Sequence, residues 1–570
     1  MLFHFSLSAA IAVTVGASAV NCAPTTTDPV VKTLNGSYVG VYDSVHHQDQ
    51  FLGVPYAQPP LGDLRFRPPQ SLNTTWSGNH NATSYRLSCQ GYLDESRLVL
   101  PQGEDCLSVH ITRPAGKQTG LLPVAFWIHG GGWYYGSGAE GFYNSSLLIE
   151  RSVNMGQPIM TVHVNYRLAA WGWLWSDEVL AEGSTNVGLR DQRMALRWVQ
   201  ENIEAFGGDP KKVTIFGESA GAGSVGKHLL AYNGRNDGLF HGAISQSGSP
   251  AGVGVWEPSH EKLASVTYNV TQTVCPHATN KLDCLRKASF EEIHNATRTT
   301  VSLFPVAYGP VVDGDILARP AAEQLRDGSF VKVPYIMGTN NDEASIYTPL
   351  GLNTAADVFD SLVSATNNVD FTIALGLMSR YPKTDNDGVL DGVPFAHFNT
   401  TVGLQFKRFL AIMSDGVFIA PTQFSANLWQ RHNNSTNLYV YNANVTISQG
   451  GNWYGAGHSF DLPYVFRSLT GVGWEDNGEP PFAGGNPFAG RPQSYIDLAD
   501  VMSGMWIGFF NNLVPHYANQ PVPEWPAFRG EDPSLYIFDA QPDKLNTRVG
   551  KELRKEKNKW FASQLYPESK

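Results

Sequence analysis

One serine of the chain stands in a setting that could make it a nucleophile. Ser219 lies within Gly217–Gly221 (Gly-Glu-Ser-Ala-Gly), between the apolar run Val213–Phe216 and a helical pattern that reaches about Leu230. This strand–turn–helix arrangement is a nucleophile elbow, whose glycines permit a turn so sharp that the serine side chain stands clear of the backbone. The positive end of the helix points at the serine, where negative charge develops during acyl transfer. The motif predicts serine-dependent acyl transfer, and an idle serine in a glycine-rich turn is the alternative.

Acyl transfer also needs N–H donors that hold the oxyanion. The stretch His129–Trp133 (His-Gly-Gly-Gly-Trp) follows the apolar run Val124–Ile128, and its glycines expose successive backbone N–H groups. Ala220, the residue after the serine, supplies a further donor. A phosphate-binding loop is the alternative, but neither Gly-Lys-Ser/Thr nor Gly-x-Gly-x-x-Gly accompanies the glycines. We therefore expect an oxyanion hole here.

A base must take the serine proton, and the chain has 16 histidines. In enzymes with such an elbow, the acid and then the histidine follow the serine along the chain. His458 fits this order, because it lies on a glycine-rich loop after the apolar run Leu438–Tyr441. Just past the run Tyr335–Met337 stand Asp342 and Glu343, either of which could orient the imidazole. A purely structural histidine is the alternative reading of His458.

The elements that must position these residues are strands alternating with helices. Helical patterns separate the strand candidates, and the pattern over 189–206 ends at Gly207–Pro210. The alternation predicts an α/β fold with a mostly parallel central sheet flanked by helices, in which functional residues gather at the carboxyl ends of strands. The helix-rich segment of about 357–431 predicts a helical cap region, with ordinary peripheral helices as the alternative. The strand candidates are 124–128, 159–166, 213–216, 242–245, 335–337 and 438–441.

The composition limits the classes of partner that we expect for the chain. Of 570 residues, 42% are apolar and 16% are charged, and no repeat or linker divides the chain, so we expect a single catalytic domain over 24–570. The net charge of −11 is spread without long blocks of one sign, which argues against nucleic acid and anionic membranes as partners. No two cysteines stand at the Cys-x2–4-Cys spacing of zinc sites, so we expect no metal, and serine chemistry needs no cofactor. The expected partner is a small-molecule ester, and the oligomeric state stays open.

The N-terminal residues predict export. An apolar run reaches about Val20, with small residues at Ala17 and Ala19, so a secretory signal peptide is expected over 1–19, with cleavage possible up to 23. No other run approaches membrane-spanning length. Four cysteines remain after Cys22; of their three possible pairings, one closes two short local loops. The density of Asn-x-Ser/Thr sequons, beginning at Asn35, predicts an N-glycosylated secreted protein.

These stretches together resemble the type-B carboxylesterase/lipase family of α/β-hydrolases, which includes cholinesterases, fungal lipases and the non-catalytic neuroligins. The resemblance extends from residue 36 to about 530 and therefore covers nearly the whole mature chain. Its matching stretches are Phe51–Ala57, Glu104–Leu107, His129–Trp133, Asn165–Arg167, Asn186–Gln192, Phe206–Pro210, Gly217–Gly226, Ser245–Gly248, Val312–Gly314, Asp342–Glu343, His458 and Trp525–Pro526.

The resemblance implies specific roles. It implies Ser219 as nucleophile, Glu343 rather than Asp342 as acid, and His458 as base. The oxyanion donors and disulfides that it implies are Gly131, Gly132 and Ala220, with the pairs Cys89–Cys106 and Cys275–Cys284.

One departure from the family narrows the function. The loop Gln90–Asp105 is short and charged, with Tyr92 but no tryptophan, unlike the long lid of the lipases and the tryptophan-bearing loop of the cholinesterases. We therefore predict a secreted serine carboxylesterase that works through an acyl-enzyme, with a triacylglycerol lipase, a non-catalytic adhesion-type homologue and, more remotely, a serine peptidase as alternatives. Trp133 and the stretch Phe304–Tyr308 are candidate walls of the acyl pocket, and core packing is the alternative for both. Acyl length, alcohol and enantiomeric preference stay open.

Overall fold

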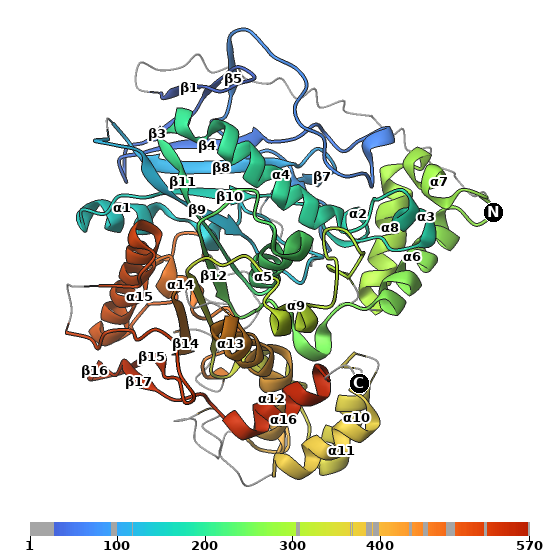
Figure 1. The fold of residues 1–570 in the computed structure, drawn as a ribbon, viewed down its shortest axis with the longest axis vertical. Helices are drawn as coiled ribbons and strands as arrows, with labels where there is room; N and C mark the ends of the chain where they lie inside the picture. Colours follow the sequence, from blue (N-terminus) through green and yellow to red (C-terminus); the bar gives the residue numbers. More distant parts are fainter. Residues whose placement is uncertain are drawn as a thin grey trace, which may run out of the picture.

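The structure is a computed structural model, and Figure 1 shows a twisted central sheet with helices on both faces. The predicted signal peptide and Phe304 lie outside the residues that it describes. The described residues are 28–92, 100–116, 118–303, 308–364, 366–367, 369–382, 390, 398–432, 436–447, 454–474, 485–517 and 521–567.

The described residues form a twelve-stranded sheet with the path β16-β15-β14-β13-β12-β11-β9-β10-β8-β4-β3, and β17 pairs with β15. The strands from β10 to β15 along this path are parallel, whereas both edges are antiparallel. The predicted mostly parallel sheet is therefore confirmed. The strands are β3 (Val41–Asp43), β4 (Gln48–Pro55), β8 (Ser108–Pro114), β9 (Leu122–Ile128), β10 (Met160–Val164), β11 (Gly208–Glu218), β12 (Gly242–Gln246), β13 (Tyr335–Asn340), β14 (Leu438–Asn444), β15 (Leu535–Gln541), β16 (Lys544–Leu545) and β17 (Arg548–Gly550).

Two small sheets flank this one. The first joins β1 (Val30–Lys32), β2 (Ser37–Val39) and β5 (Asn79–Asn81), and the second pairs β6 (Ser88–Cys89) with β7 (Gln102–Gly103).

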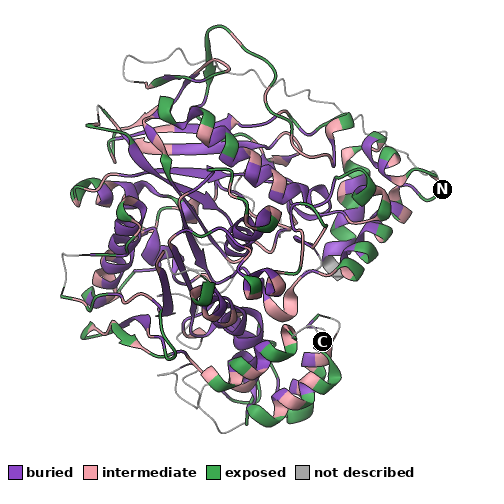
Figure 2. Cartoon of the chain, in the orientation of Figure 1, coloured by how far each residue is buried: buried purple, intermediate pink, exposed green. Residues whose placement is uncertain are grey.

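Each central strand buries both of its faces, as the purple strands of Figure 2 show. In β9, Val124 and Phe126 belong to one hydrophobic core, while Ala125 and Trp127 belong to the other, because side chains alternate across a strand. This double burial explains why the strands read as continuous apolar runs. Residues of α4 (Val187–Asn202) and α5 (Ala220–Gly234) join the first core, and residues of α1 (Ser146–Asn154), α14 (Leu462–Val465) and α15 (Gln493–Asn512) join the second.

The helix predicted over 189–206 appears as α4 followed by a 3-10 turn, Ile203–Phe206. Gly207 ends it with φ of 83°, a left-handed conformation that glycine adopts without steric cost. The other helices on this part of the chain are α2 (Ala169–Gly172), α3 (Asp177–Ala181), α6 (His260–Val274), α7 (Lys281–Lys287), α8 (Phe290–Leu303) and α9 (Ala321–Asp327).

The described part of segment 357–431 is rich in helices. It contains most of α10 (Ala355–Val363), then α11 (Phe371–Arg380), α12 (Phe406–Ser414), a π-helical turn over Asp415–Ile419 and most of α13 (Ala420–His432). The C-terminal helix α16 (Lys555–Leu565) packs against α13 and the π-helical turn. Its role as a cap and the division of the chain into one domain remain predictions.

Both expected disulfides are present. Cys89 is bonded to Cys106, and Cys275 is bonded to Cys284, at sequence separations of 17 and 9 residues. Each pair closes one of the short local loops. Within the described ranges, every helix is too short or too polar to traverse a lipid bilayer.

Candidate active site

The register of the parallel strands brings the predicted site residues to one edge of the sheet. Gly217 of β11 pairs with Ile128 of β9 on one side and with Ser245 of β12 on the other. Gln246 of β12 pairs with Gly338 of β13 in turn. The segments that follow these strands therefore leave the sheet together, as the carboxyl-end rule predicts.

The elbow at Ser219 has the predicted geometry. Ser219 adopts φ of 57° and ψ of −123°, between the end of β11 and the start of α5. A Cβ at Gly217 would lie 2.6 Å from the carbonyl oxygen of Ile128, and one at Gly221 would lie 2.0 Å from the same oxygen. Only glycine fits either position, because a contact under 3 Å is sterically forbidden. This close approach of strand and helix exposes the serine side chain.

The glycine loop after β9 packs directly against Ser219. A Cβ at Gly130 would lie 3.1 Å from the Cβ of Ser219. Gly131 and Gly132 both adopt positive φ angles, 96° and 59°, and the carbonyl oxygen of Gly131 accepts hydrogen bonds from the next turn of backbone. Gly132 and Ala220 line the same cavity as Ser219. The loop thus lies beside Ser219, and its role as an oxyanion hole stays a prediction.

Glu343 holds His458 through a short hydrogen bond. The imidazole Nδ1 lies 2.6 Å from Glu343 Oε2, and both side chains are buried. The other carboxylate oxygen, Oε1, accepts hydrogen bonds from Ser247 Oγ at 2.6 Å and from the backbone N–H of Asn340 at 2.7 Å. These contacts fix the carboxylate, which in turn fixes the tautomer and orientation of the imidazole.

Asp342, the neighbouring acid, points elsewhere. Its Oδ1 accepts from the N–H of Leu390, and its Oδ2 accepts from the N–H of Ala456, two residues before His458. Burial raises the pKa of this carboxyl to about 6. Asp342 therefore supports the histidine loop, and Glu343 is the acid in contact with the imidazole.

The other imidazole nitrogen faces a second carboxylate. His458 Nε2 lies 3.2 Å from Glu218 Oε1, which also accepts a hydrogen bond from Ser459 Oγ at 2.7 Å. Glu218 directly precedes Ser219, and a Cβ at Gly130 would lie 2.9 Å from Glu218 Oε2 and 3.1 Å from Ser219 Cβ. Nε2 is therefore at the elbow, although no hydrogen bond joins it to Ser219 Oγ among the described residues. Catalytic hydrogen bonds are often long before substrate binds.

The surroundings of this site shift the pKa of the His458 imidazole and that of the Glu218 carboxyl. Burial lowers the pKa of His458, but the Glu218 and Glu343 carboxylates outweigh burial and raise it to about 9. Burial raises the pKa of Glu218 to about 7, despite the opposing effect of the imidazolium. A buried ion pair with two carboxylates thus stabilises the protonated imidazole in the free protein.

A cavity of about 100 Å³ opens beside Ser219. Trp133, which the sequence proposed as a wall, lines it, and its indole N–H donates to Ser224 Oγ. Phe418 lies over the imidazole of His458, with ring centroids 4.5 Å apart. The walls are therefore mainly aromatic. They comprise Gly132, Trp133, Tyr134, Tyr135, Ser219, Ala220, Val253, Trp256, Tyr308, Tyr347 and Phe418.

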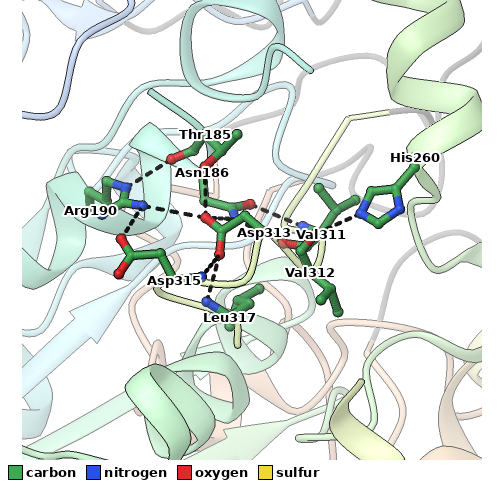
Figure 3. A network of polar contacts seen from close by, with 9 residues as sticks. All are labelled: Thr185, Asn186, Arg190, His260, Val311, Val312, Asp313, Asp315 and Leu317. Carbon is green, nitrogen blue, oxygen red and sulfur yellow. Dashed lines mark hydrogen bonds and ion pairs between the residues drawn. The ribbon is translucent and has the colours of Figure 1, made fainter. Parts of the chain in front are cut away.

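Figure 3 shows a network of polar contacts that anchors residues 311–317, the segment that follows the cavity residue Tyr308. The Asp313 carboxylate is inaccessible to solvent. It accepts hydrogen bonds from Thr185 Oγ1 and Asn186 Nδ2 at the start of α4, and from the backbone N–H groups of Asp315 and Leu317. Asn186 also donates to the carbonyl of Val311, three residues after Tyr308. The network fixes the chain that leads out of the cavity wall.

Sequence reasoning missed several of these residues. Glu218 and Ser247 stand at or just after the carboxyl ends of β11 and β12, so the strand-end rule could have found them. Phe418 and Tyr347 carry no such signal. Within the described ranges, no group of three or more His, Cys, Asp or Glu side chains is placed to hold a metal ion.

Comparisons with known proteins agree with this geometry. Residues 27–560 match the model of the carboxylesterase family. The chain is 35% identical over 507 residues to Lipase 2 of Geotrichum candidum, covering 80% of this chain and 86% of that one. It is 36% identical to Secreted lipase 1 of Botryotinia fuckeliana, covering 65% and 69%. Among solved structures, EstA of Aspergillus niger superposes with a TM-score of 0.79 at 27% identity, covering 95% and 99%.

Proposed function

Since the chain belongs to the carboxylesterase family, and is thus a carboxylic ester hydrolase with the α/β-hydrolase fold, we propose that it is a secreted serine carboxylesterase with Ser219, Glu343 and His458 as its triad. The observation that carries the triad is the 2.6 Å contact between Glu343 and His458 at the elbow of Ser219. That contact gives the imidazole a fixed orientation beside Ser219, the serine of the elbow.

In the first half-reaction, His458 Nε2 takes the proton of Ser219 Oγ as the oxygen bonds to the ester carbonyl carbon. The carbonyl electron pair moves to oxygen, and the N–H groups of Gly131, Gly132 and Ala220 hold the oxyanion. The intermediate collapses, the bond to the alcohol oxygen breaks, and the alcohol leaves with the proton from Nε2. Glu343 stabilises the imidazolium throughout.

In the second half-reaction, water replaces the alcohol. His458 takes a proton from the water as its oxygen bonds to the acyl carbon, and the same oxyanion donors hold the second intermediate. Collapse breaks the bond to Ser219 Oγ, which regains its proton from Nε2, and the acid is released.

The cavity supports esters of short acyl chains. A volume of about 100 Å³ is well below the roughly 300–1,000 Å³ of sites that enclose drug-sized ligands. Lipase activity is the second candidate, because the curated relatives named above are fungal lipases. Exposed Phe371 and Leu375 on α11 offer apolar surface of the kind that a lipid interface would contact.

Export is supported by three observations. The N-terminal apolar run has the pattern of a signal peptide, both cysteine pairs are oxidised, and one relative is named a secreted lipase. The sequons would then carry N-linked glycans.

The test is hydrolysis of p-nitrophenyl acetate, butyrate and decanoate by the purified protein. Ser219→Ala should lower kcat by at least about 10⁴-fold without loss of thermal stability. The matched variant Ser563→Ala, at a surface serine of α16, should keep full activity. Undiminished turnover by Ser219→Ala would reject the nucleophile. Activity that rises sharply once tributyrin exceeds its solubility would instead favour the lipase.

A further inference from the structure

The turn between α12 and α13 is π-helical. Over Asp415–Ile419 the hydrogen bonds span five residues, so that the N–H of Ala420 reaches the carbonyl of Asp415. A π turn holds one residue more than an α turn, is rare in proteins, and occurs frequently at functional sites. Such a turn persists where surrounding contacts stabilise it.

This π turn carries Phe418 into the catalytic cavity. The Phe418 ring lies 4.5 Å from that of His458 and 6.3 Å, edge on, from that of Trp256, measured between centroids. Phe418 is therefore both a cavity wall and a surface against the proposed base. Its position depends on the register of the turn that bears it.

A buried ion pair ties the first residue of the turn to the C-terminal helix. Arg554, at the start of α16, donates to both carboxylate oxygens of Asp415 at 2.7 to 2.9 Å. The exposed fractions of the two side chains are only 2% and 0%. The hydroxyl of Tyr381 donates to Asp415 Oδ2 at 2.6 Å. This carboxylate is fixed from two sides.

The second residue of the turn is packed just as closely. A Cβ at Gly416 would lie 2.6 Å from the ring of Phe561 on α16. On the opposite side, a Cβ at Gly254 would lie 1.8 Å from the carbonyl oxygen of Gly416. Gly254 follows the cavity residue Val253 directly and is two residues before Trp256. The C-terminal helix thus supports the π turn, and the turn supports two stretches of cavity wall.

We propose that Arg554 and Asp415 are positioning residues that hold the π turn, and with it Phe418, and so determine which acyl chains the cavity accepts. The proposal rests on the proposed esterase function. Without the ion pair, the turn relaxes toward α-helical geometry, in which a one-residue change of register rotates a side chain by about 100° around the helix axis. That rotation removes Phe418 from the wall and opens the cavity to longer chains.

The main test is the double variant Arg554→Met/Asp415→Leu. It removes both charges together and replaces them with apolar side chains, a replacement that often preserves stability, whereas a single change leaves a buried charge unpaired. We expect the ratio of kcat/KM for p-nitrophenyl decanoate to that for the butyrate to rise about tenfold or more, the scale on which a pocket discriminates chain length. The ratio does not depend on the folded fraction, because one sample serves both substrates.

The control is Arg65→Met/Glu104→Leu. Arg65 and Glu104 form another bidentate buried pair, each 9% exposed, and within the described ranges no hydrogen bond or ion pair joins them to a cavity residue. This variant should leave the ratio unchanged even if its melting temperature falls. If the double variant at 415 and 554 also leaves the ratio unchanged while its melting temperature falls, its defect is only structural and the proposal is wrong.

Milder variants keep the question decidable if the double variant does not fold. Phe561→Leu removes ring contacts behind Gly416 and should also raise the ratio. Arg554→Lys keeps the positive charge and should keep the ratio near the wild-type value. An unchanged ratio in Phe561→Leu would then overturn the inference. Failure of the esterase proposal is distinct from these outcomes. It appears as absent hydrolysis by the wild-type protein or as undiminished hydrolysis by Ser219→Ala.

Discussion

Replacing Glu218 by glutamine removes a negative charge from beside the proposed base. Glu218 Oε1 lies 3.2 Å from His458 Nε2, and its charge has the largest effect among the carboxylates that raise the imidazole pKa to about 9. The amide keeps the size of the side chain and the acceptor for Ser459. The variant therefore tests charge rather than packing.

The expected change in pKa follows from the direction of each effect. An opposite charge within about 4–6 Å typically moves a pKa by 1–3, and Glu343 still raises the imidazole pKa in the variant. We therefore expect the His458 pKa to fall by about one to two. Only the neutral imidazole accepts the serine proton, so activity is lost as pH falls through this pKa. The acid limb of the rate profile should thus move to lower pH.

The measurement is kcat/KM for p-nitrophenyl butyrate from pH 5 to 10 at constant ionic strength, with each profile normalised to its own plateau. Below the wild-type limb, lowering the imidazole pKa by one raises the normalised rate about tenfold. Glu552→Gln is the control, because burial also raises the pKa of Glu552, while in the described part of the chain no hydrogen bond or ion pair joins it to the imidazole. A limb that stays in place or moves to higher pH would refute the electrostatic reasoning.

Three further changes have defined outcomes. Ser247→Ala removes a 2.6 Å hydrogen bond to Glu343. Hydrogen bonds to charged groups are worth about 1.5–3 kcal/mol, so kcat should fall about 10- to 100-fold at unchanged KM. An unchanged kcat would contradict the role of this contact. Gly131→Ala places a Cβ 2.2 Å from a backbone oxygen at φ of 96°. We expect kcat to collapse and the melting temperature, measured by scanning fluorimetry, to fall. Retention of full activity would exclude the glycine loop from catalysis. Cys89→Ser/Cys106→Ser opens a short loop and should lower the free energy of unfolding by about 3 kcal/mol, measured by urea denaturation, and a loss below about 1 kcal/mol would show that the bond is dispensable.

Local steric requirements made the elbow predictable from sequence. The glycines at 217 and 221 are required by contacts with one carbonyl oxygen, and such a requirement appears as a fixed spacing in the sequence. The helix over 189–206 was predictable for a similar reason, since its glycine stop acts locally. Strand ends aligned by register then placed the histidine and acid segments near the serine.

Choices that depend on long-range packing were not predictable from spacing. Asp342 and Glu343 follow the same strand, and only Ser247 and the N–H of Asn340 decide which carboxylate meets the imidazole. The family resemblance, not the residue pattern, selected Glu343. Phe418 could not be found at all, because its place depends on one additional residue in a helical turn.

The distribution of the site over β11, β13 and β14 has a consequence for biosynthesis. Roughly 240 residues separate Ser219 from His458, so at about 5–20 residues per second the ribosome needs tens of seconds to make the second after the first. During that interval the nascent polypeptide contains the elbow but not His458, the proposed base. Under the proposed triad, ester cleavage begins only after the later strands have docked, which delays hydrolytic activity inside the cell that makes the protein.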